Sequence, residues 1–330
     1  MSVTRADVAR LAGVSTAVVS YVVNNGPRPV ATHTRQAVET AIEQLGYRPN
    51  VMARALKGGI SGSVGLILPD QSNPYFAELA HAIEFAFRER ETLVLIGTLS
   101  RSFERSRRYA ELLIERRVDA IIAVGDTPLE DYLCNLDNVP VALVDRASEG
   151  NEGTFSVQTS GFDGAFRAVE HLSSHGHRYI GCVAGPPGIG VTRSRVDGWR
   201  ASTGEESASL IAHGDFSAVG GSRAAMSLLS AGERRAASRL PRPTALFVSS
   251  DIQAMGVLHA CDQLGLRVPD DIAITSFDGT RAGAFTHPAL TSFRQPVEAM
   301  AEALVSFLDH GGTEGVRLDG NLVIRNSCGC

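Results

Sequence analysis

Two patterns of hydrophobic positions follow one another along the chain, and the change between them falls near residue 60. In the first part, apolar side chains recur at the spacing of amphipathic helices, and no stretch has the pattern of a strand. Thr4 and Ser15 stand where helix N-caps are expected, and Gly13 and Gly46 stand where helices end. The predicted helices cover residues 5–11, 16–23, 32 or 34 to 45, and a short stretch from 49 to 56.

From residue 63 onward, short apolar runs rich in β-branched residues alternate with helical stretches. Such runs are typical of parallel sheets that are covered by helices on both faces. The alternation occurs twice, so we predict two α/β lobes with a break near residues 146–162, and we expect Leu290–Gln295 to return toward the first lobe. The predicted strands contain VGLILPD, TLVLIGTL, AIIAVGD and VPVALVDR in the first lobe, and YIGCVAG, TALFVSS and DIAITSFD in the second.

Polar residues follow several of these predicted strands. In open parallel sheets, ligands bind beyond the carboxyl ends of the strands, and two lobes that face each other across such ends form a cleft. The sequence therefore predicts a ligand site between the lobes. The residues at these strand ends are Asp70, Asp145, Ser250, Asp251 and Asp278.

The net charge of −5 is unevenly distributed along the chain. Residues 1–60 carry seven basic and three acidic side chains, whereas the remaining residues carry 24 basic and 33 acidic ones. A basic head on an acidic body suggests that the head alone meets a polyanion. An imbalance of this size also arises by chance, so charge by itself does not decide the matter.

The apolar runs and the cysteines of the chain indicate the cellular compartment of the protein. No run approaches the roughly 18 apolar residues that a membrane helix needs, and the N-terminal residues form no apolar signal core. Five scattered cysteines do not make a disulfide framework and suit a reducing compartment. We therefore expect a cytoplasmic protein with no membrane partner.

The segment DVARLAGVSTAVVSYVVN, residues 7–24, carries the strongest local signal. Two predicted helices meet at a tight turn that contains Gly13, and the second helix begins on a small polar residue. That arrangement lets the second helix enter the major groove of DNA while the first braces it across the backbone. The alternative is an ordinary helical hairpin without a DNA-binding role.

An ordered series of segments resembles the lac-repressor family of bacterial regulators. It runs from ADVARLAGVSTAVVSYVVN through TRQAVETAIEQLGYRPN, ARALK, VGLILPDQSNPYF, VALVDR and HLSSHGHRYIGCVAG. It continues through RSRVDGW, PTALFVSSDIQAMG, ITSFDGT and LTSFRQPVEAMAEAL to VIRNS, and it covers essentially the whole chain.

The resemblance implies an architecture and a function. It implies a helix-turn-helix DNA-binding domain at 1–47, a hinge helix and linker at 48–60, and a two-lobed, periplasmic-binding-protein-like domain for effector binding and dimerisation at 61–330. The implied function is that of a sequence-specific transcriptional repressor, neither an enzyme nor cofactor-dependent. A small-molecule effector would control the affinity of a homodimer for a near-palindromic double-stranded DNA operator.

The resemblance also assigns DNA-contacting positions. Tyr21 departs from the Arg that most members carry and cannot make a bidentate contact to guanine, so the operator preference should be unusual. Leu56 matches the leucine that opens a minor-groove base step at a central CG step, although it could instead be a core residue. Base readout falls to Thr16, Ala17 and Tyr21, the minor-groove and hinge contacts to Ala53, Arg54 and Leu56, and backbone contacts to Ser15, Ser20, Asn24, Thr34 and Arg35. For the two serines, helix capping and local hydrogen bonding are the alternative.

Effector-binding positions carry over to the cleft. Carboxylates and an arginine that face hydroxyl groups suit a sugar or sugar derivative better than a nucleobase. Ser250 stands where Asn is usual, Gln158-Thr159-Ser160 replaces an Asp-Asn pattern, and the stretch after Trp199 is shorter than in relatives, so the effector is not fixed by the resemblance. The implied positions are Asp70, Asn73, Tyr75, Phe76, Asp145, Arg195, Ser250, Asp278 and Gln295.

Three other motifs are set aside. GPPGIGVT, residues 185–192, nearly fits a phosphate-binding loop, but Val191 stands where lysine is required. His171, His175 and His177 are spaced as metal ligands could be, but a capping or surface role is expected. Cys328 and Cys330 are expected to lie in a frayed terminus. The sequence thus predicts no metal site.

Two other classes of protein remain as alternatives. A sugar-binding transport component would share the two-lobed body, but it requires export and has no DNA-binding head. An α/β enzyme would need a nucleophile–base pair, a metal set or an intact phosphate loop, and the sequence offers none of these.

Overall fold

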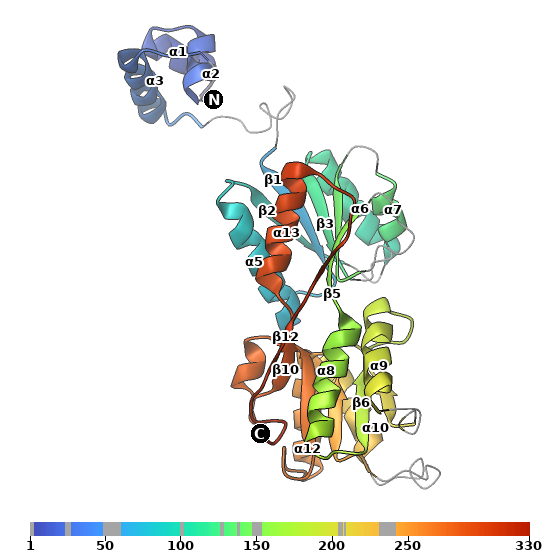
Figure 1. Cartoon of the computed structure of the whole chain (residues 1–330). Helices are drawn as coiled ribbons and strands as arrows, with labels where there is room; N and C mark the ends of the chain where they lie inside the picture. The colour runs from blue at the N-terminus through green and yellow to red at the C-terminus, as the bar shows by residue number, and fades with distance from the viewer. Residues whose placement is uncertain are drawn as a thin grey trace. The chain divides into compact units, whose positions relative to one another are not determined.

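The computed structural model divides into two compact units, Met1–Ser61 and Gly62–Cys330 (Figure 1). The predicted helical stretch at 49–56 lies outside the described residues. Those are residues 3–23, 28–48, 61–99, 102–125, 129–136, 139–146, 154–203, 207, 209–230 and 242–330.

The described part of the head contains α1 (Arg5–Ala12), α2 (Thr16–Val23) and α3 (Thr32–Leu45), which agree with the predicted helices to within a residue or so. Thr4 and Asp7 form a reciprocal capping box at the start of α1, where the Thr4 backbone N–H donates to Asp7 Oδ2 at 2.9 Å. Valines from all three helices close the small core; the fully buried ones are Val8, Val19 and Val38.

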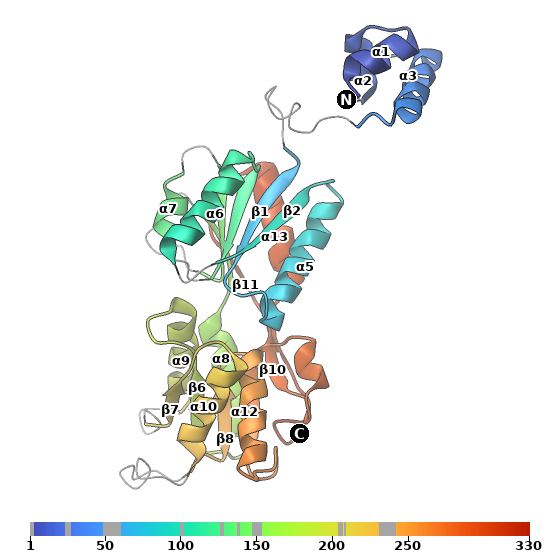
Figure 2. The same ribbon diagram turned by 180° about the vertical axis from the view of Figure 1, so that it is seen from behind.

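The first lobe is a six-stranded sheet in the order β11-β5-β4-β3-β1-β2, and all of its neighbouring strands run parallel. Helices α5 (Pro74–Arg88) and α13 (Val297–His310) cover one face, and α6 (Phe103–Glu115) and α7 (Glu130–Cys134) cover the other (Figures 1 and 2). The strands are β1 (Ser63–Leu68), β2 (Leu93–Thr98), β3 (Ala120–Val124), β4 (Val141–Val144), β5 (Phe155–Thr159) and β11 (Val316–Leu318).

The second lobe repeats this plan with the order β12-β10-β9-β8-β6-β7, in which only β12 runs antiparallel to its neighbour. Helices α8 (Gly161–Ser174) and α9 (Gly190–Thr203) cover one face, and α10 (Ala218–Leu229) and α12 (Asp251–Gln263) cover the other. A 3₁₀ helix, η2, spans Ala282–Phe285. The strands are β6 (Ile180–Ala184), β7 (Ile211–His213), β8 (Ala245–Val248), β9 (Ala273–Asp278), β10 (Thr291–Arg294) and β12 (Asn321–Val323).

The chain crosses between the lobes three times, after β5, after β10 and after β11. The expectation that Leu290–Gln295 returns to the first lobe was wrong, because β10 pairs in parallel with β9 inside the second sheet. The return follows directly after it, through α13. Strand β5 lies within the predicted break, so the first sheet extends further along the chain than expected.

None of the described helices is by itself both long and apolar enough to span a bilayer. Taken together as one bent pair, α1 and α2 reach the length and apolar composition of such a span.

Candidate DNA interface and effector cleft

Helix α2 presents one face away from the core of the head. Thr16 and Ala17 are exposed and Tyr21 is half-buried, whereas Val19 and Val22 point into the core. Helices α1 and α2 meet at 104°, an angle typical of a helix-turn-helix. The positions predicted to read bases thus lie together on an accessible face of the second helix.

Local contacts occupy several of the predicted backbone-contacting groups. Ser15 Oγ accepts a hydrogen bond from the Val18 backbone N–H at 3.4 Å, so the capping role that was the alternative is present. Thr34 Oγ1 lies 3.1 Å from His33 Nε2, and Arg35 forms a long ion pair of 4.0 Å with Glu39. Such exposed contacts are worth little and do not prevent these side chains from reaching a phosphate.

Tyr21 has a cationic neighbour that the sequence did not point to. The guanidinium carbon of Arg28 lies 5.9 Å from the centre of the Tyr21 ring, within the range of a cation–π contact. Arg28 therefore supplies a positive charge beside the one position where the chain departs from the usual arginine. The remaining predicted contacts, Asn24, Ala53, Arg54 and Leu56, lie outside the described residues.

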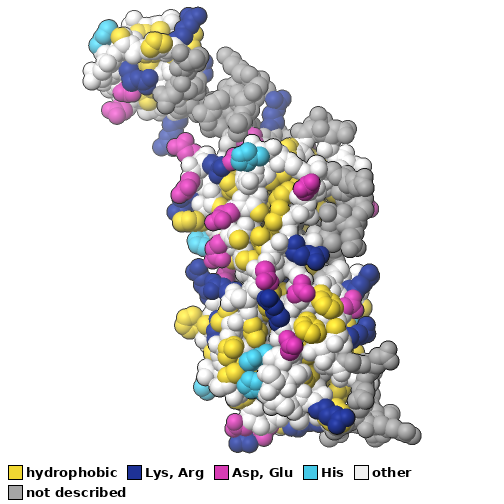
Figure 3. All heavy atoms as spheres, in the orientation of Figure 1, with side chains coloured by type: hydrophobic (Ala, Val, Ile, Leu, Met, Phe, Trp, Pro, Cys, Tyr) yellow, Lys and Arg dark blue, Asp and Glu magenta, His cyan; other side chains and the backbone are white. Residues whose placement is uncertain are grey.

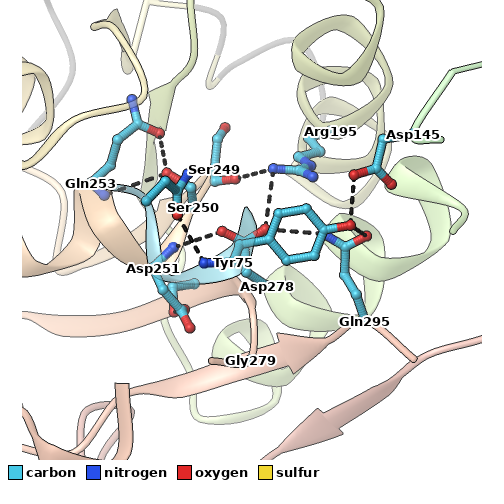
Figure 4. A network of polar contacts seen from close by, with 12 residues as sticks. Tyr75, Asp145, Arg195, Ser249, Ser250, Asp251, Gln253, Asp278, Gly279 and Gln295 are labelled. Atoms are coloured by element: carbon cyan, nitrogen blue, oxygen red, sulfur yellow. Dashed lines mark hydrogen bonds and ion pairs between the residues drawn. The ribbon is translucent and has the colours of Figure 1, made fainter. Parts of the chain in front are cut away.

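On the first-lobe side of the cleft, three side chains meet where the lobes face each other (Figure 4). Tyr75 comes from the first turn of α5, Asp145 directly follows β4, and Gln295 directly follows β10. The Tyr75 hydroxyl donates to Asp145 Oδ2 at 2.6 Å and lies 3.4 Å from Gln295 Oε1.

On the second-lobe side, Gln295 Nε2 donates to Asp278 Oδ1 at 3.1 Å. Arg195 Nη1 lies 3.7 Å from the same carboxylate oxygen and donates to the Ser249 carbonyl at 2.5 Å. The guanidinium carbon also lies 3.9 Å from the centre of the Phe277 ring. A continuous polar network therefore runs from Asp145 in one lobe to Arg195 in the other.

Both carboxylates of this network have unusual backbones. Asp145 has φ of 60° and Asp278 has φ of 111°. Non-glycine residues rarely adopt positive φ, and such strain concentrates at binding and catalytic sites. The backbone thus marks the two cleft aspartates independently of their side-chain contacts.

Burial dominates the electrostatics of the cleft. Asp145, Arg195 and Asp278 are 8%, 6% and 4% exposed. Burial raises the pKa of Tyr75 well above its usual value and raises the pKa of Asp145. It also raises the pKa of Asp278 to about 8, against the opposing charge of Arg195. Near neutral pH, the carboxyl of Asp278 is therefore largely protonated, and the charge of Arg195 is only partly balanced.

Several buried polar atoms beside this network lack partners. Among the described residues, no group hydrogen-bonds to Arg195 Nε, Thr192 Oγ1 or Ser249 Oγ. Buried polar atoms are nearly always satisfied, so these atoms are available to a further partner. The sequence reasoning missed both Thr192, which lies one turn before Arg195 on α9, and Ser249, whose carbonyl only the fold brings to Arg195.

A cavity of about 300 Å³ adjoins the network, and residues of both lobes line it. A larger hollow of about 880 Å³ lies on the outer face of α5 and α13, away from the network. The smaller cavity is the one that Asp145, Arg195 and Gln295 of the network line. Its charged lining residues are Asp145, Arg146, Arg193, Arg195, Asp197 and Arg317.

Four predicted effector positions have structural partners instead of joining the network. Asp70 is exposed and accepts hydrogen bonds from its neighbour Ser72 in a local turn. Asn73 caps α5 by accepting from the Tyr75 backbone N–H at 3.1 Å. Phe76 packs on the Tyr75 ring and on the first-lobe core. Ser250 caps α12 and hydrogen-bonds Gln253.

Comparison with known proteins gives matches at both ends of the chain. A domain described as "Bacterial regulatory proteins, lacI family" matches residues 4–50, and a "Periplasmic binding protein-like domain" matches residues 169–328. The HTH-type transcriptional repressor PurR of Edwardsiella ictaluri (strain 93-146) is 34% identical over 302 residues, which are 89% of this chain and 86% of the relative. PurR of Escherichia coli O1:K1 / APEC is 33% identical over 309 residues, 92% and 88% of the two chains.

Solved structures agree with these matches. The lac repressor dimer bound to operator and the anti-inducer ONPF superposes with a TM-score of 0.84 at 27% identity, over 99% of each chain. The complex of the transcriptional regulator CelR with cellobiose gives a TM-score of 0.70 at 28% identity, over 98% of this chain and 99% of the other.

The raised pKa of Asp278 predicts a pH-dependent stability. The folded protein retains this proton up to about pH 8, whereas the unfolded chain loses it near pH 4, so stability falls as the pH rises across that window. Asp278→Asn removes this dependence. We expect the free energy of unfolding of the wild type, relative to the variant, to fall by up to about 1.4 kcal/mol per pH unit and to level off above pH 8.

Urea unfolding from pH 5 to pH 9 measures the difference. Asp262→Asn, at an exposed position of α12, serves as the control and should follow the wild type. Parallel pH profiles for Asp278→Asn and the wild type would show that Asp278 ionises normally in the folded protein.

Proposed function

The chain belongs to the lacI family of bacterial regulatory proteins and is a DNA-binding transcriptional repressor. We propose that a sugar or sugar derivative bound between its lobes controls its affinity for a near-palindromic operator. Its relatives are repressors and not enzymes. Repressors of this family bind operator DNA and small-molecule effectors and function as dimers. The observation that carries the effector proposal is the buried, strained and incompletely satisfied polar network between the lobes.

We propose that the exposed face of α2 reads the operator in the major groove. Thr16 and Ala17 would meet base edges and thymine methyl groups, and Tyr21, with Arg28 beside it, would take the place of the usual arginine. Ser15, Ser20, Thr34 and Arg35 would hold the head against phosphates, and the predicted hinge contacts at Ala53, Arg54 and Leu56 would add the minor groove.

Tyr21→Ala tests base readout. The variant should bind the specific operator about 5- to 150-fold more weakly, because it loses one base contact, and non-specific DNA almost as well as the wild type. Fluorescence anisotropy at one fixed salt concentration measures both affinities. Gln44→Ala, exposed near the end of α3, is the control. An equal loss on both DNAs would assign Tyr21 to the backbone or to the fold.

The chemistry of the cleft supports a polar, hydroxyl-rich effector. Carboxyl groups and an arginine form charge-assisted hydrogen bonds to hydroxyls, and the unpartnered Nε of Arg195, which lines the cavity, offers a further one. The cavity lining holds more arginines than aspartates, and protonation of Asp145 would add to that excess. Within the sugar class, this favours a phosphorylated or acidic derivative. The CelR–cellobiose complex supports a sugar in this fold, and a nucleobase is the competing class.

The network also suggests how an effector would act on DNA binding. Gln295 bonds groups of both lobes, so a ligand that replaces these contacts changes how the lobes meet. The ligand can shift the lobes only by its differential affinity for the two states, and coupling of about 1–3 kcal/mol is typical. We propose that this movement reaches the DNA through the predicted hinge at 48–57, because so short a helix orders only with outside support.

Arg195→Ala and Asp278→Asn test the cleft. A thermal-shift screen of the wild type with neutral sugars, sugar phosphates and nucleobases first identifies the effector. Calorimetry should then show about 10- to 150-fold weaker effector binding in both variants, because Arg195→Ala removes a charged donor and Asp278→Asn alters the carboxyl group that Arg195 and Gln295 contact. Operator binding without effector should stay near wild type.

Arg200→Ala, exposed on the same helix as Arg195, is the control. Wild-type effector affinity in both variants would refute the cleft assignment. Stabilisation by nucleobases alone would refute the sugar proposal while leaving the site intact.

We propose that the outer face of α5 and α13 joins two copies of the chain. Figure 3 shows hydrophobic side chains among charged ones on this face, and the hollow of about 880 Å³ lies over it. Phe85 is 58% exposed there, next to Ala82 and Ala86. A large exposed aromatic in a groove marks an interaction site better than scattered apolar residues do. The lac repressor dimer, with which the chain superposes, supports an assembly of two copies.

Phe85→Asp tests the dimer. A buried carboxylate on each copy would face its twin, so the variant should be monomeric in light scattering at micromolar concentration, where we expect the wild type to be dimeric. Phe103→Asp, at an exposed position of α6, is the matched control and should remain dimeric. A dimeric Phe85→Asp variant would place the interface elsewhere.

A further inference from the structure

Two motifs that the sequence analysis set aside separately lie together in the second lobe. His171 and His175 stand one turn apart at the end of α8, and Cys328 and Cys330 close the chain. Figure 1 shows the C-terminus in the lobe that α8 covers, and Figure 3 shows histidine side chains gathered on this face. About 150 residues of sequence separate the two pairs.

The ligand atoms of His171, Cys328 and Cys330 converge, and the His175 ring adjoins this group through Cys330 and His171. Cys330 Sγ lies 3.5 Å from His171 Nε2 and 3.3 Å from His175 Nε2. The His171 nitrogen and the sulfurs of Cys328 and Cys330 all lie within 4.8 Å of one another. The two imidazole rings are 4.7 Å apart between centres.

These distances suit a tetrahedral metal ion. Zn–S bonds of about 2.3 Å and Zn–N bonds of about 2.0–2.1 Å at tetrahedral angles place sulfur and nitrogen about 3.5 Å apart. A hydrogen bond between the Cys330 thiol and one imidazole would account for one of these contacts. A cation bound by all of these groups would account for both imidazoles and the second sulfur near the Cys330 thiol.

We propose that His171, His175, Cys328 and Cys330 form a binding site for Zn²⁺ that fastens the C-terminal segment to α8. A set of two thiolates and two imidazoles selects zinc over the oxygen-seeking Mg²⁺ and Ca²⁺. On binding, each thiol gives its proton to the solvent, and the two sulfurs and two ring nitrogens complete the coordination.

The surroundings support the site. Thr291 Oγ1 donates to Cys328 Sγ at 3.0 Å, the kind of outer contact that orients and stabilises a metal-bound thiolate. Cys328 is buried, whereas His175 and Cys330 are exposed, so one side of the cluster is open to an entering ion.

The site would couple the metal to the stability of the second lobe. Ser327 already holds the C-terminal segment to the second sheet. Its carbonyl accepts a hydrogen bond from the Ile274 backbone N–H at 2.7 Å, and its hydroxyl accepts one from the Thr291 backbone N–H at 2.8 Å. The metal would add a bond from the end of the chain to the helix on the adjacent face. Binding only the folded state raises the melting temperature as zinc increases.

The experiment uses the full-length reduced protein after removal of metals by a chelator. Zinc titration in a calorimeter should show one ion per chain, and Co²⁺ should give the absorption of a tetrahedral thiolate complex. Zinc should also raise the melting temperature. Cys330→Ser and His171→Ala should each weaken zinc binding at least about 10- to 100-fold.

Two controls separate this site from other thiols and imidazoles. His177→Ala alters the next histidine along the chain, which contacts Thr244, and Cys134→Ser alters a cysteine of the first lobe. Both should bind zinc like the wild type. Cys330 lies exposed at the chain end, so its variant should fold normally, and circular dichroism checks this. Absence of stoichiometric zinc binding, a cobalt spectrum without thiolate bands, or unchanged binding in Cys330→Ser would overturn the proposal.

Discussion

The polar groups of the cleft are arranged around one buried charge, the guanidinium of Arg195. Removing such a charge from water costs several kcal/mol unless other groups replace the lost hydration. The Ser249 carbonyl, the Phe277 ring and the Asp278 carboxyl do so only in part, because burial itself raises the pKa of Asp278 to about 8. Arg195 Nε keeps no partner among the described residues. The charge of Arg195 is therefore incompletely balanced within the fold, and a ligand in the cleft could supply the missing hydrogen bonds.

The topology makes this deficit sensitive to the angle between the lobes. Because the chain crosses three times, both sheets end at the same boundary, and no single segment carries the connection. Gln295 stands in the second crossing, where it contacts Tyr75 of one lobe and Asp278 of the other. Helix α13 begins two residues later and packs beside α5 on the proposed dimer face. A change at Gln295 therefore has a short physical route to that face.

Elements with a repeating pattern were predictable from the sequence. The head helices and most strands follow from periodicity, and Asp145, Arg195, Asp278 and Gln295 do meet as the resemblance implied. The segment that forms β10 was expected in the wrong lobe, because four residues, two of them polar and buried, do not indicate with which sheet they pair.

What the sequence could not supply was proximity between distant segments. Ser249 directly follows β8, and only the fold brings its carbonyl to Arg195 on α9. For Asp70 and Ser250, a position at a strand end did not reveal that the side chain would be used in a turn or a helix cap. Polar residues at such ends are candidates for either role, and only their contacts distinguish the two.

The C-terminal segment is the clearest case of contacts between distant segments that the sequence did not predict. A short edge strand followed by a chain end is expected to fray, because few contacts offset the entropy of ordering it. Here β12 has three residues, yet Ser327 and Cys328 beyond it are buried and hydrogen-bonded to β9 and β10. That anchoring brings Cys330 to the two histidines of α8. Neither pair of residues could form a metal site alone. The edge of the second sheet brings the two pairs together, and this contact makes the proposed set of four ligands possible.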